Sequence, residues 1–116
     1  MKRNFSLIKN NIRVDITKPL RALYIQNELK LPQSTAKIIG NIEIEANVHR
    51  YWHDPIEVEK VEFYIDDNLK TTDTTFPYSW IWDSGDLLHH RYTIRVIAYD
   101  VEGNNASDEI TVWKFM

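Results

Sequence analysis

The feature that most constrains this chain is a run of alternating apolar and polar residues between Val61 and Asp100. A strand turns successive side chains to opposite faces, so such alternation predicts paired strands with one buried face. Asp67 and Asn68 interrupt the run, and both residue types tolerate the positive φ of a tight hairpin turn. The alternating segments are residues 61–66, 78–83 and 92–99.

Three large aromatic residues, Tyr78, Trp80 and Trp82, share one face of the middle segment. Such a row could be a platform on which a ligand stacks. We favour a core role, because each large aromatic side chain buries much apolar area and strand periodicity commonly produces this spacing. Trp80→Ala and Trp82→Ala should then both be strongly destabilising.

The remaining alternation predicts further strands over residues 12–16, 20–25, 38–48, 57–65 and 106–112. The segment 38–48 turns Asn41, Glu43, Glu45 and Asn47 outward, whereas the polar, Pro-containing residues 26–35 are predicted to be a loop. About seven or eight strands at spacings near ten residues, with no convincing helix, predict an all-β antiparallel sandwich.

The length of 116 residues fits one domain, which we place at residues 12–116 after a linker or frayed end at residues 1–11. The net charge of −3 argues against a nucleic-acid partner bound through its phosphates. The absence of cysteine excludes disulfides, a thiol nucleophile and cysteine-based metal sites. No apolar run approaches the ~20 residues of a membrane helix, and the apolar patch near Met1 is too short for a signal peptide.

Several motifs resemble bacterial and archaeal immunoglobulin-like domains, over about residues 38–112. They are VEFYID at 61–66, PYSW at 77–80, WD at 82–83, YTIRV at 92–96, AYD at 98–100 and GN at 103–104. The resemblance implies an immunoglobulin-like β-sandwich that serves as a spacer, adhesin segment or accessory domain in a larger secreted or cell-surface protein. The expected partners are neighbouring domains or another protein.

One loop departs from the family pattern, which usually has a short polar connection before VEFYID. Here the loop contains Tyr51, Trp52 and His53. Strand periodicity does not require these aromatic rings, so Tyr51 and Trp52 are candidates for stacking on a polysaccharide, with His53 beside them. The alternative is that the two rings cap the open end of the sandwich. Trp113 and Phe115 also have two possible roles. They could stack on a sugar, or they could pack against another domain or the Leu23 region.

Asp and Asn residues recur in the predicted turns, and Ca²⁺ takes oxygen ligands from such turns. Asp100 and Asn104 are the best calcium candidates, although Asp and Asn also stabilise turns by bonding to their own backbone. His49 and His53 are four residues apart in a loop, and the adjacent His89 and His90 would point to opposite faces of a strand, so neither pair favours a transition metal.

No serine stands in a nucleophile motif, and the carboxylates are spread over outward faces, so we expect no enzymatic activity and no obligatory cofactor. The sequence favours a non-catalytic immunoglobulin-like structural or interaction module of an extracellular or cell-surface protein. The alternative is a carbohydrate-binding accessory domain that uses the Tyr51–Trp52 loop.

Overall fold

The computed structural model describes residues 12–50, 57–85 and 89–116, and these residues form ten strands and no helix. The strands are β1 (Ile12–Lys18), β2 (Ala22–Ile25), β3 (Glu28–Pro32), β4 (Ala36–Ile39), β5 (Ile42–Arg50), β6 (Val58–Ile65), β7 (Asn68–Asp73), β8 (Tyr78–Trp82), β9 (Arg91–Asp100) and β10 (Asn105–Phe115).

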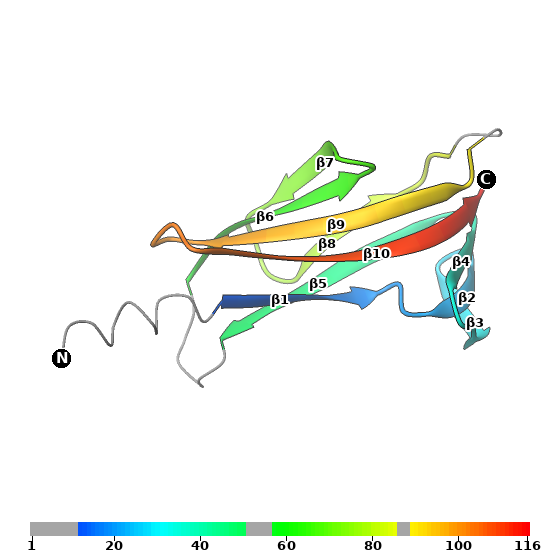
Figure 1. Cartoon of the computed structure of the whole chain (residues 1–116), viewed down its shortest axis with the longest axis horizontal. Coiled ribbons are helices and arrows are strands. Elements are labelled where there is room, and N and C mark those ends of the chain that lie inside the picture. The colour runs from blue at the N-terminus through cyan, green and yellow to red at the C-terminus, as the bar shows by residue number, and fades with distance from the viewer. Residues whose placement is uncertain (1–11, 51–56, 86–88) are drawn as a thin grey trace.

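The strands form two sheets, which confirms the predicted all-β immunoglobulin-like sandwich (Figure 1). One sheet has the order β1-β5-β8 and is antiparallel throughout. The other has the order β3-β2-β4-β10-β9-β6-β7, in which the β2–β4 and β4–β10 pairs are parallel. The two sheets are also joined by a hydrogen bond, because the Ile16 amide donates to Asp108 Oδ2 at 2.9 Å.

The core contains the inward residues of the alternating segments, as expected from strand periodicity. Phe63, Ile94 and Val96 are fully buried between the sheets. Tyr78 and Trp82 are buried as predicted, and Trp80 is half-buried against the same core. The Trp82 ring meets the Tyr92 ring edge-on with centroids 4.9 Å apart, a favourable aromatic geometry.

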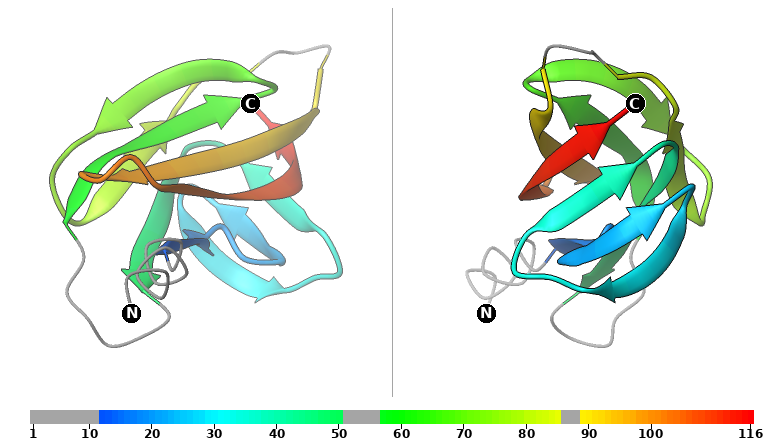
Figure 2. Two further views of the ribbon diagram at one scale, coloured as in Figure 1. Left: turned by 60° about the vertical axis from the view of Figure 1, so that its left-hand side comes forward. Right: turned by 90° about the vertical axis from the view of Figure 1, so that its right-hand side faces the viewer.

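The prediction of a loop over residues 26–35 was wrong, because residues 22–32 form the β2–β3 hairpin. Gln26 and Asn27, with φ of 48° and 72°, make its two-residue turn. In Figure 1 β2, β3 and β4 stand nearly upright at one end of the molecule, and Figure 2 shows them across from the β6–β7 hairpin. The β2–β3 hairpin therefore explains part of the difference between the ten observed strands and the seven or eight that were expected.

The expected single strand over residues 38–48 is two strands in different sheets. Gly40 has φ of 86°, and this left-handed conformation breaks the alternation between Ile38 and Ile42. A Cβ at Gly40 would also lie 2.6 Å from the Gln26 side chain. The crossover between sheets therefore depends on a residue without a side chain.

The β6–β7 turn is centred one residue earlier than the sequence suggested. Asp66 and Asp67 have φ of 49° and 67°, whereas Asn68 already begins β7. The Asp66 carboxylate accepts a hydrogen bond from the Thr93 amide at 2.9 Å, so this aspartate also ties the turn to β9.

Candidate functional site

A groove crosses the outer face of the three-stranded sheet. Its larger part has a volume of about 530 Å³, and a smaller part of about 260 Å³ shares Glu43 with it. We call this surface the β5 groove. It is lined by Thr17, Gln26, Asn27, Asn41, Ile42, Glu43, Glu45, Ala46, Asn47, Phe76, Pro77, Tyr78, Ser79 and Ile81.

The floor of the β5 groove is polar because β5 alternates. Glu43 and Glu45 point outward between the buried Ile42, Ile44 and Ala46. Each β5 carboxylate lies beside an outward residue of β8, since Glu43 pairs with Ile81 and Glu45 with Ser79. Among the described residues neither carboxylate has an ion-pair or hydrogen-bond partner, so both can accept hydrogen bonds from a ligand.

Two exposed apolar side chains interrupt this polar floor. Phe76 is 76% exposed, the highest fraction among the large hydrophobic residues that the structure describes, and Ile81 is 60% exposed. The Phe76 and Tyr78 rings meet edge-on with centroids 6.1 Å apart. This contact supports the Phe76 ring at the side of the groove.

A second surface lies on the seven-stranded sheet, on the outer face of β2, β3, β4 and the end of β10. Strand register places Leu31, Leu23, Lys37 and Trp113 in one row across the four strands. Ile25, Ile39 and Phe115 form the next row. We call these seven residues the insertion face.

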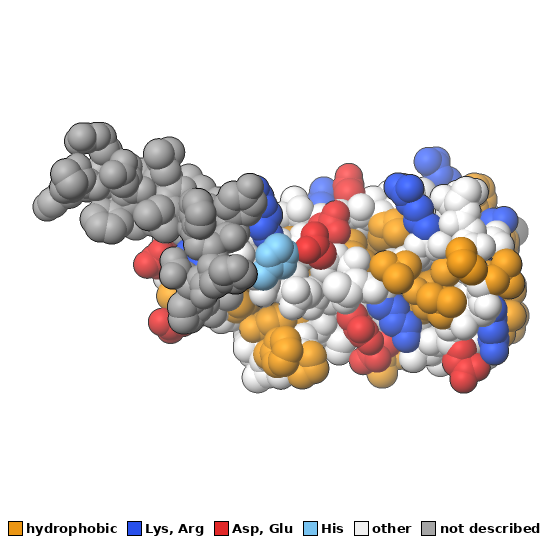
Figure 3. Space-filling model, turned by 90° about the horizontal axis from the view of Figure 1, so that it is seen from below, with side chains coloured by type: hydrophobic (Ala, Val, Ile, Leu, Met, Phe, Trp, Pro, Cys, Tyr) orange, Lys and Arg blue, Asp and Glu red, His pale blue; other side chains and the backbone are white. Residues whose placement is uncertain are grey.

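Apolar exposure is concentrated at this end of the molecule. Of the eleven exposed large hydrophobic residues in the described chain, seven fall in residues 20–31 or 113–116. In Figure 3 hydrophobic side chains gather at the right-hand end of the molecule, with Lys and Arg side chains between them. The His90 ring packs on Phe115 with centroids 4.8 Å apart. Such a cluster of exposed apolar residues is typical of an interaction surface.

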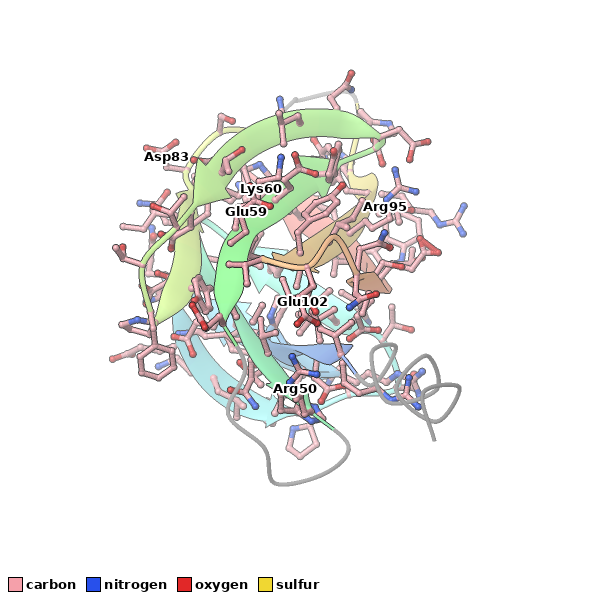
Figure 4. All side chains as sticks on the ribbon, turned by 90° about the vertical axis from the view of Figure 1, so that its left-hand side faces the viewer. Arg50, Glu59, Lys60, Asp83, Arg95 and Glu102 are labelled. Carbon is pink, nitrogen blue, oxygen red and sulfur yellow. The ribbon has the colours of Figure 1, made fainter. Side chains whose placement is uncertain are left out.

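The outer face of β6 and β9 is also polar, but its groups contact one another. The Tyr64 hydroxyl donates to Glu62 Oε1 at 2.9 Å, and this bond raises the pKa of Tyr64. Lys60 Nζ lies 4.8 Å from the centroid of the Tyr99 ring, and the Arg95 guanidinium lies 5.3 Å from that of Tyr64. Figure 4 shows Lys60 and Arg95 on this face.

The structure brings the two calcium candidates together at the β9–β10 turn. Asp100 is fully buried, and its Oδ1 accepts hydrogen bonds from the Glu102 and Asn104 amides at 2.9 Å each. Its Oδ2 accepts from Asn104 Nδ2 at 3.0 Å and lies 3.9 Å from the Arg50 guanidinium. Arg50 and the Glu102 turn lie at the same end of the molecule in Figure 4.

Burial alone would raise the pKa of Asp100, but the hydrogen bonds from Asn104 and Glu102 and the Arg50 charge outweigh it and hold the pKa below the usual range. These hydrogen bonds show that Asp100 and Asn104 stabilise the β9–β10 turn. The described residues contain no group of three His, Asp or Glu side chains that could hold a metal ion, and calcium binding at Asp100 and Asn104 stays a prediction.

Lys114 is a buried cation at the end of β10. It is 1% exposed, and its Nζ donates to the backbone oxygens of Ser84 and Met116 at 3.0 and 2.8 Å. The Nζ also lies 5.0 Å from the centroid of the Trp82 ring. Burial lowers the pKa of Lys114, and the Asp83 charge partly opposes this shift.

The sugar-binding candidates Tyr51, Trp52 and His53 lie outside the described residues. Trp113 and Phe115, the other aromatic pair noted in the sequence, lie on the insertion face. Sequence reasoning noticed that Glu43 and Glu45 point outward but missed their proximity to Phe76. The strand pairing between β5 and β8 creates that proximity, and no local pattern signals it.

In the part of the chain that the structure describes, no helix is long and apolar enough to cross a membrane.

Comparisons with solved structures agree with the fold. The fibronectin(III)-like modules of Clostridium thermocellum CbhA superpose with a TM-score of 0.64 at 20% identity, over 90% of this chain and 46% of theirs. An engineered protein superposes with a TM-score of 0.56 at 13% identity, over 89% of this chain and 20% of its own. The chain thus spans less than half of either structure. No curated protein is similar enough in sequence to count as a relative.

The sequence also matches a family model, described as the bacterial Ig domain, over residues 28–96. The match includes the β6–β7 hairpin, β8 and the first half of β9, and so contains four of the six motifs noted above, VEFYID, PYSW, WD and YTIRV. It covers more than half of the 116 residues. The chain therefore belongs to the bacterial Ig domain family.

Proposed function

We propose that this chain is a non-catalytic interaction module within a larger secreted or cell-surface protein, where the insertion face contacts a neighbouring domain. The observation that carries the proposal is that four of the seven insertion-face residues are exposed large hydrophobic side chains, namely Ile25, Leu31, Trp113 and Phe115. A contact there would remove Trp113, Phe115 and Leu31 from water, and the burial of such side chains stabilises association.

The fold supports a role as a part of a larger chain. Bacterial Ig domains and fibronectin(III)-like folds usually occur as modules, and this chain covers only 46% and 20% of the two solved structures. Within the described residues the carboxylates, serines and histidines do not converge on a nucleophile, base and orienting group, so the proposal assigns no catalysis.

The first experiment determines the size and location of the native polypeptide. An antibody against the purified domain is used on blots of cell and culture-medium fractions. The proposal expects a product much larger than 13.8 kDa in the surface or medium fraction. A free product of the domain's own size in the cytoplasm would contradict it.

Hydroxyl-radical footprinting then tests the contact itself. Trp113, Phe115 and Leu31 should be modified several-fold more slowly in the native polypeptide than in the isolated domain. Leu69, which is exposed on β7, is the matched control and should react equally in both. Equal modification of the insertion face in both proteins would show that no neighbour covers it.

Carbohydrate binding is the second candidate function, because the β5 groove combines an exposed ring with free polar groups. The Tyr51–Trp52 loop remains a candidate from the sequence. If Trp52→Ala left binding to a panel of polysaccharides unchanged, that loop would have no part in it.

A further inference from the structure

We infer that the β5 groove is a binding site for an extended, uncharged oligosaccharide chain, with Phe76 as the stacking ring and Glu43 and Glu45 as hydrogen-bond acceptors. The inference deepens the second candidate function and assigns it to a surface distinct from the Tyr51–Trp52 loop.

The length of the groove favours a chain over a compact ligand. Its two pockets share Glu43, and their lining runs from Asn41, just before β5, to Asn47 on β5. Six residues of a strand at about 3.4 Å each span roughly 20 Å. The groove is open to solvent along the outer face of a sheet, so a small metabolite would leave most of this length uncovered. A linear polymer fits such a surface without needing an enclosed pocket.

The polar lining suits vicinal hydroxyl groups. A carboxylate accepts hydrogen bonds only, whereas the side-chain amides of Asn41 and Asn47 both donate and accept. A sugar hydroxyl also donates and accepts, so adjacent hydroxyls can satisfy a carboxylate and an amide together. Because Glu43 and Glu45 have no partner among the described residues, a ligand would not have to displace an existing interaction.

The Asn27 side chain lines the groove and supports its floor. Its Oδ1 accepts a hydrogen bond from the Glu43 amide at 2.8 Å. This bond fixes the start of β5 against the β2–β3 turn, so the backbone position of Glu43 is set by the fold before a ligand arrives. Preorganisation of this kind lowers the entropy cost of binding.

The apolar groups suit the C–H faces of sugar rings. The face of an aromatic ring carries negative potential and attracts polarised C–H groups. Phe76 is 76% exposed and is held by Tyr78 at the side of the groove, while Ile81 is 60% exposed beside Glu43. A ligand with polar edges and apolar faces would contact both kinds of group.

A basic peptide is the alternative occupant, since two carboxylates also attract Lys and Arg. The ionic strength separates the two ligands, because attraction between exposed charges is screened by salt whereas stacking and neutral hydrogen bonds are not. Among the described residues that line the groove, the two carboxylates carry the only charges and all the other polar groups are neutral, and these neutral groups favour the uncharged ligand.

The test is NMR titration of the ¹⁵N-labelled chain with cellohexaose, mannohexaose and the hexamer of N-acetylglucosamine, and with hexalysine. The inference expects at least one hexasaccharide to shift the amides of Glu43, Glu45 and Ser79, with an affinity unchanged by 0.5 M NaCl. Phe76→Ala and Glu45→Ala should each weaken binding by about tenfold or more. The controls Leu69→Ala and Glu59→Gln alter exposed residues outside the groove and should leave binding unchanged.

The opposite results are equally clear. No shift with any of the three hexasaccharides, or shifts confined to residues away from the groove, would overturn the inference. Binding of hexalysine alone, abolished by salt, would reassign the groove to a basic peptide. Each of these outcomes leaves the module proposal standing, because that proposal depends on footprinting of the insertion face and on the size of the native product.

Discussion

The β5 groove and the insertion face are both outer faces of the same sandwich, yet they expose different chemistry. The groove combines the carboxylates of Glu43 and Glu45 with exposed apolar side chains such as Phe76 and Ile81. The insertion face is apolar with one cation, Lys37, between Leu23 and Trp113. Inward residues on both sheets are mostly apolar, and the buried charges of Asp100 and Lys114 lie on the seven-stranded sheet. The fold therefore constrains only the inner faces, and the outward positions are free to specify the partner.

The largest expected effect tests whether one face of β8 is buried in the core while the opposite face lines the β5 groove. Trp82 is 2% exposed and Ile81 is 60% exposed on the opposite face. Trp82→Ala should lower the free energy of unfolding by about 3–5 kcal/mol, as large-to-small core changes do. Ile81→Ala should change it by less than about 0.5 kcal/mol. Chemical denaturation measures both values. Trp80→Ala should fall between them, because Trp80 is only half-buried.

If Ile81→Ala and Trp82→Ala lowered the free energy of unfolding by similar amounts, the prediction would be wrong, because the groove face of β8 would then be buried as well.

The next effect distinguishes polar groups that hold the fold from those left for a ligand. Asp100→Ala removes a buried carboxylate that accepts three hydrogen bonds and lies 3.9 Å from the Arg50 guanidinium. It should destabilise the domain by about 2–4 kcal/mol. Glu43→Gln and Glu45→Gln, which break no protein contact, should stay within about 0.5 kcal/mol of the wild type. Thermal unfolding at pH 7 measures all three variants.

The same aspartate gives a pH dependence of stability. The pKa of Asp100 is lower in the folded protein than in the unfolded chain, so the unfolded chain binds more protons in the window between the two values. Its contribution is present above the unfolded pKa of about 3.9 and is lost as the pH falls through the folded pKa. Asp100→Asn should flatten that acid limb, and an unchanged limb would contradict the assignment.

A moderate effect is expected where the chain passes from the insertion face to the groove. Gly40→Ala places a Cβ 2.6 Å from Gln26 Oε1 at a φ of 86°, so it should cost about 1–3 kcal/mol. The double variant with Gln26→Ala should recover the steric part and leave the backbone strain. Unfolding free energies of the two single variants and the double variant form the cycle. If the effects of Gly40→Ala and Gln26→Ala on the free energy of unfolding are additive, the Gln26 side chain moves away from the new Cβ without loss of stability.

The smallest effect concerns the buried cation beneath the insertion face. Burial lowers the pKa of Lys114 in the folded protein, so the unfolded chain binds more protons between the folded pKa and 10.5. The Lys114 contribution therefore makes stability rise with pH through this window. Lys114→Met should remove that rise, measured as the difference between the two pH profiles, in which the tyrosine contributions cancel. If the two proteins showed the same pH dependence of stability, the pKa of Lys114 would not differ between the folded and the unfolded state, and the prediction would be wrong.

Local pattern predicted the inner faces well, because the two-residue period of a strand is written directly in the sequence. It placed Tyr78 and Trp82 in the core and predicted an all-β sandwich, whereas the immunoglobulin-like character came from the motif resemblance over residues 38–112. It failed at residues 28–32, where ELKLP is an edge strand with every side chain exposed. Such a strand buries nothing, so no periodicity reveals it, and only its pairing with β2 defines it.

The sequence by itself also determined which residues face outward on β5, but not what they face. Glu43, Phe76 and Ile81 line one surface because β8 pairs with β5, and Leu23 shares a face with Trp113 because β4 joins β2 to β10 in parallel. These contacts join residues more than thirty positions apart, and sheet pairing, not local propensity, selects them. Alternation thus decided the core, whereas tertiary pairing decided both surfaces through which this domain is proposed to act.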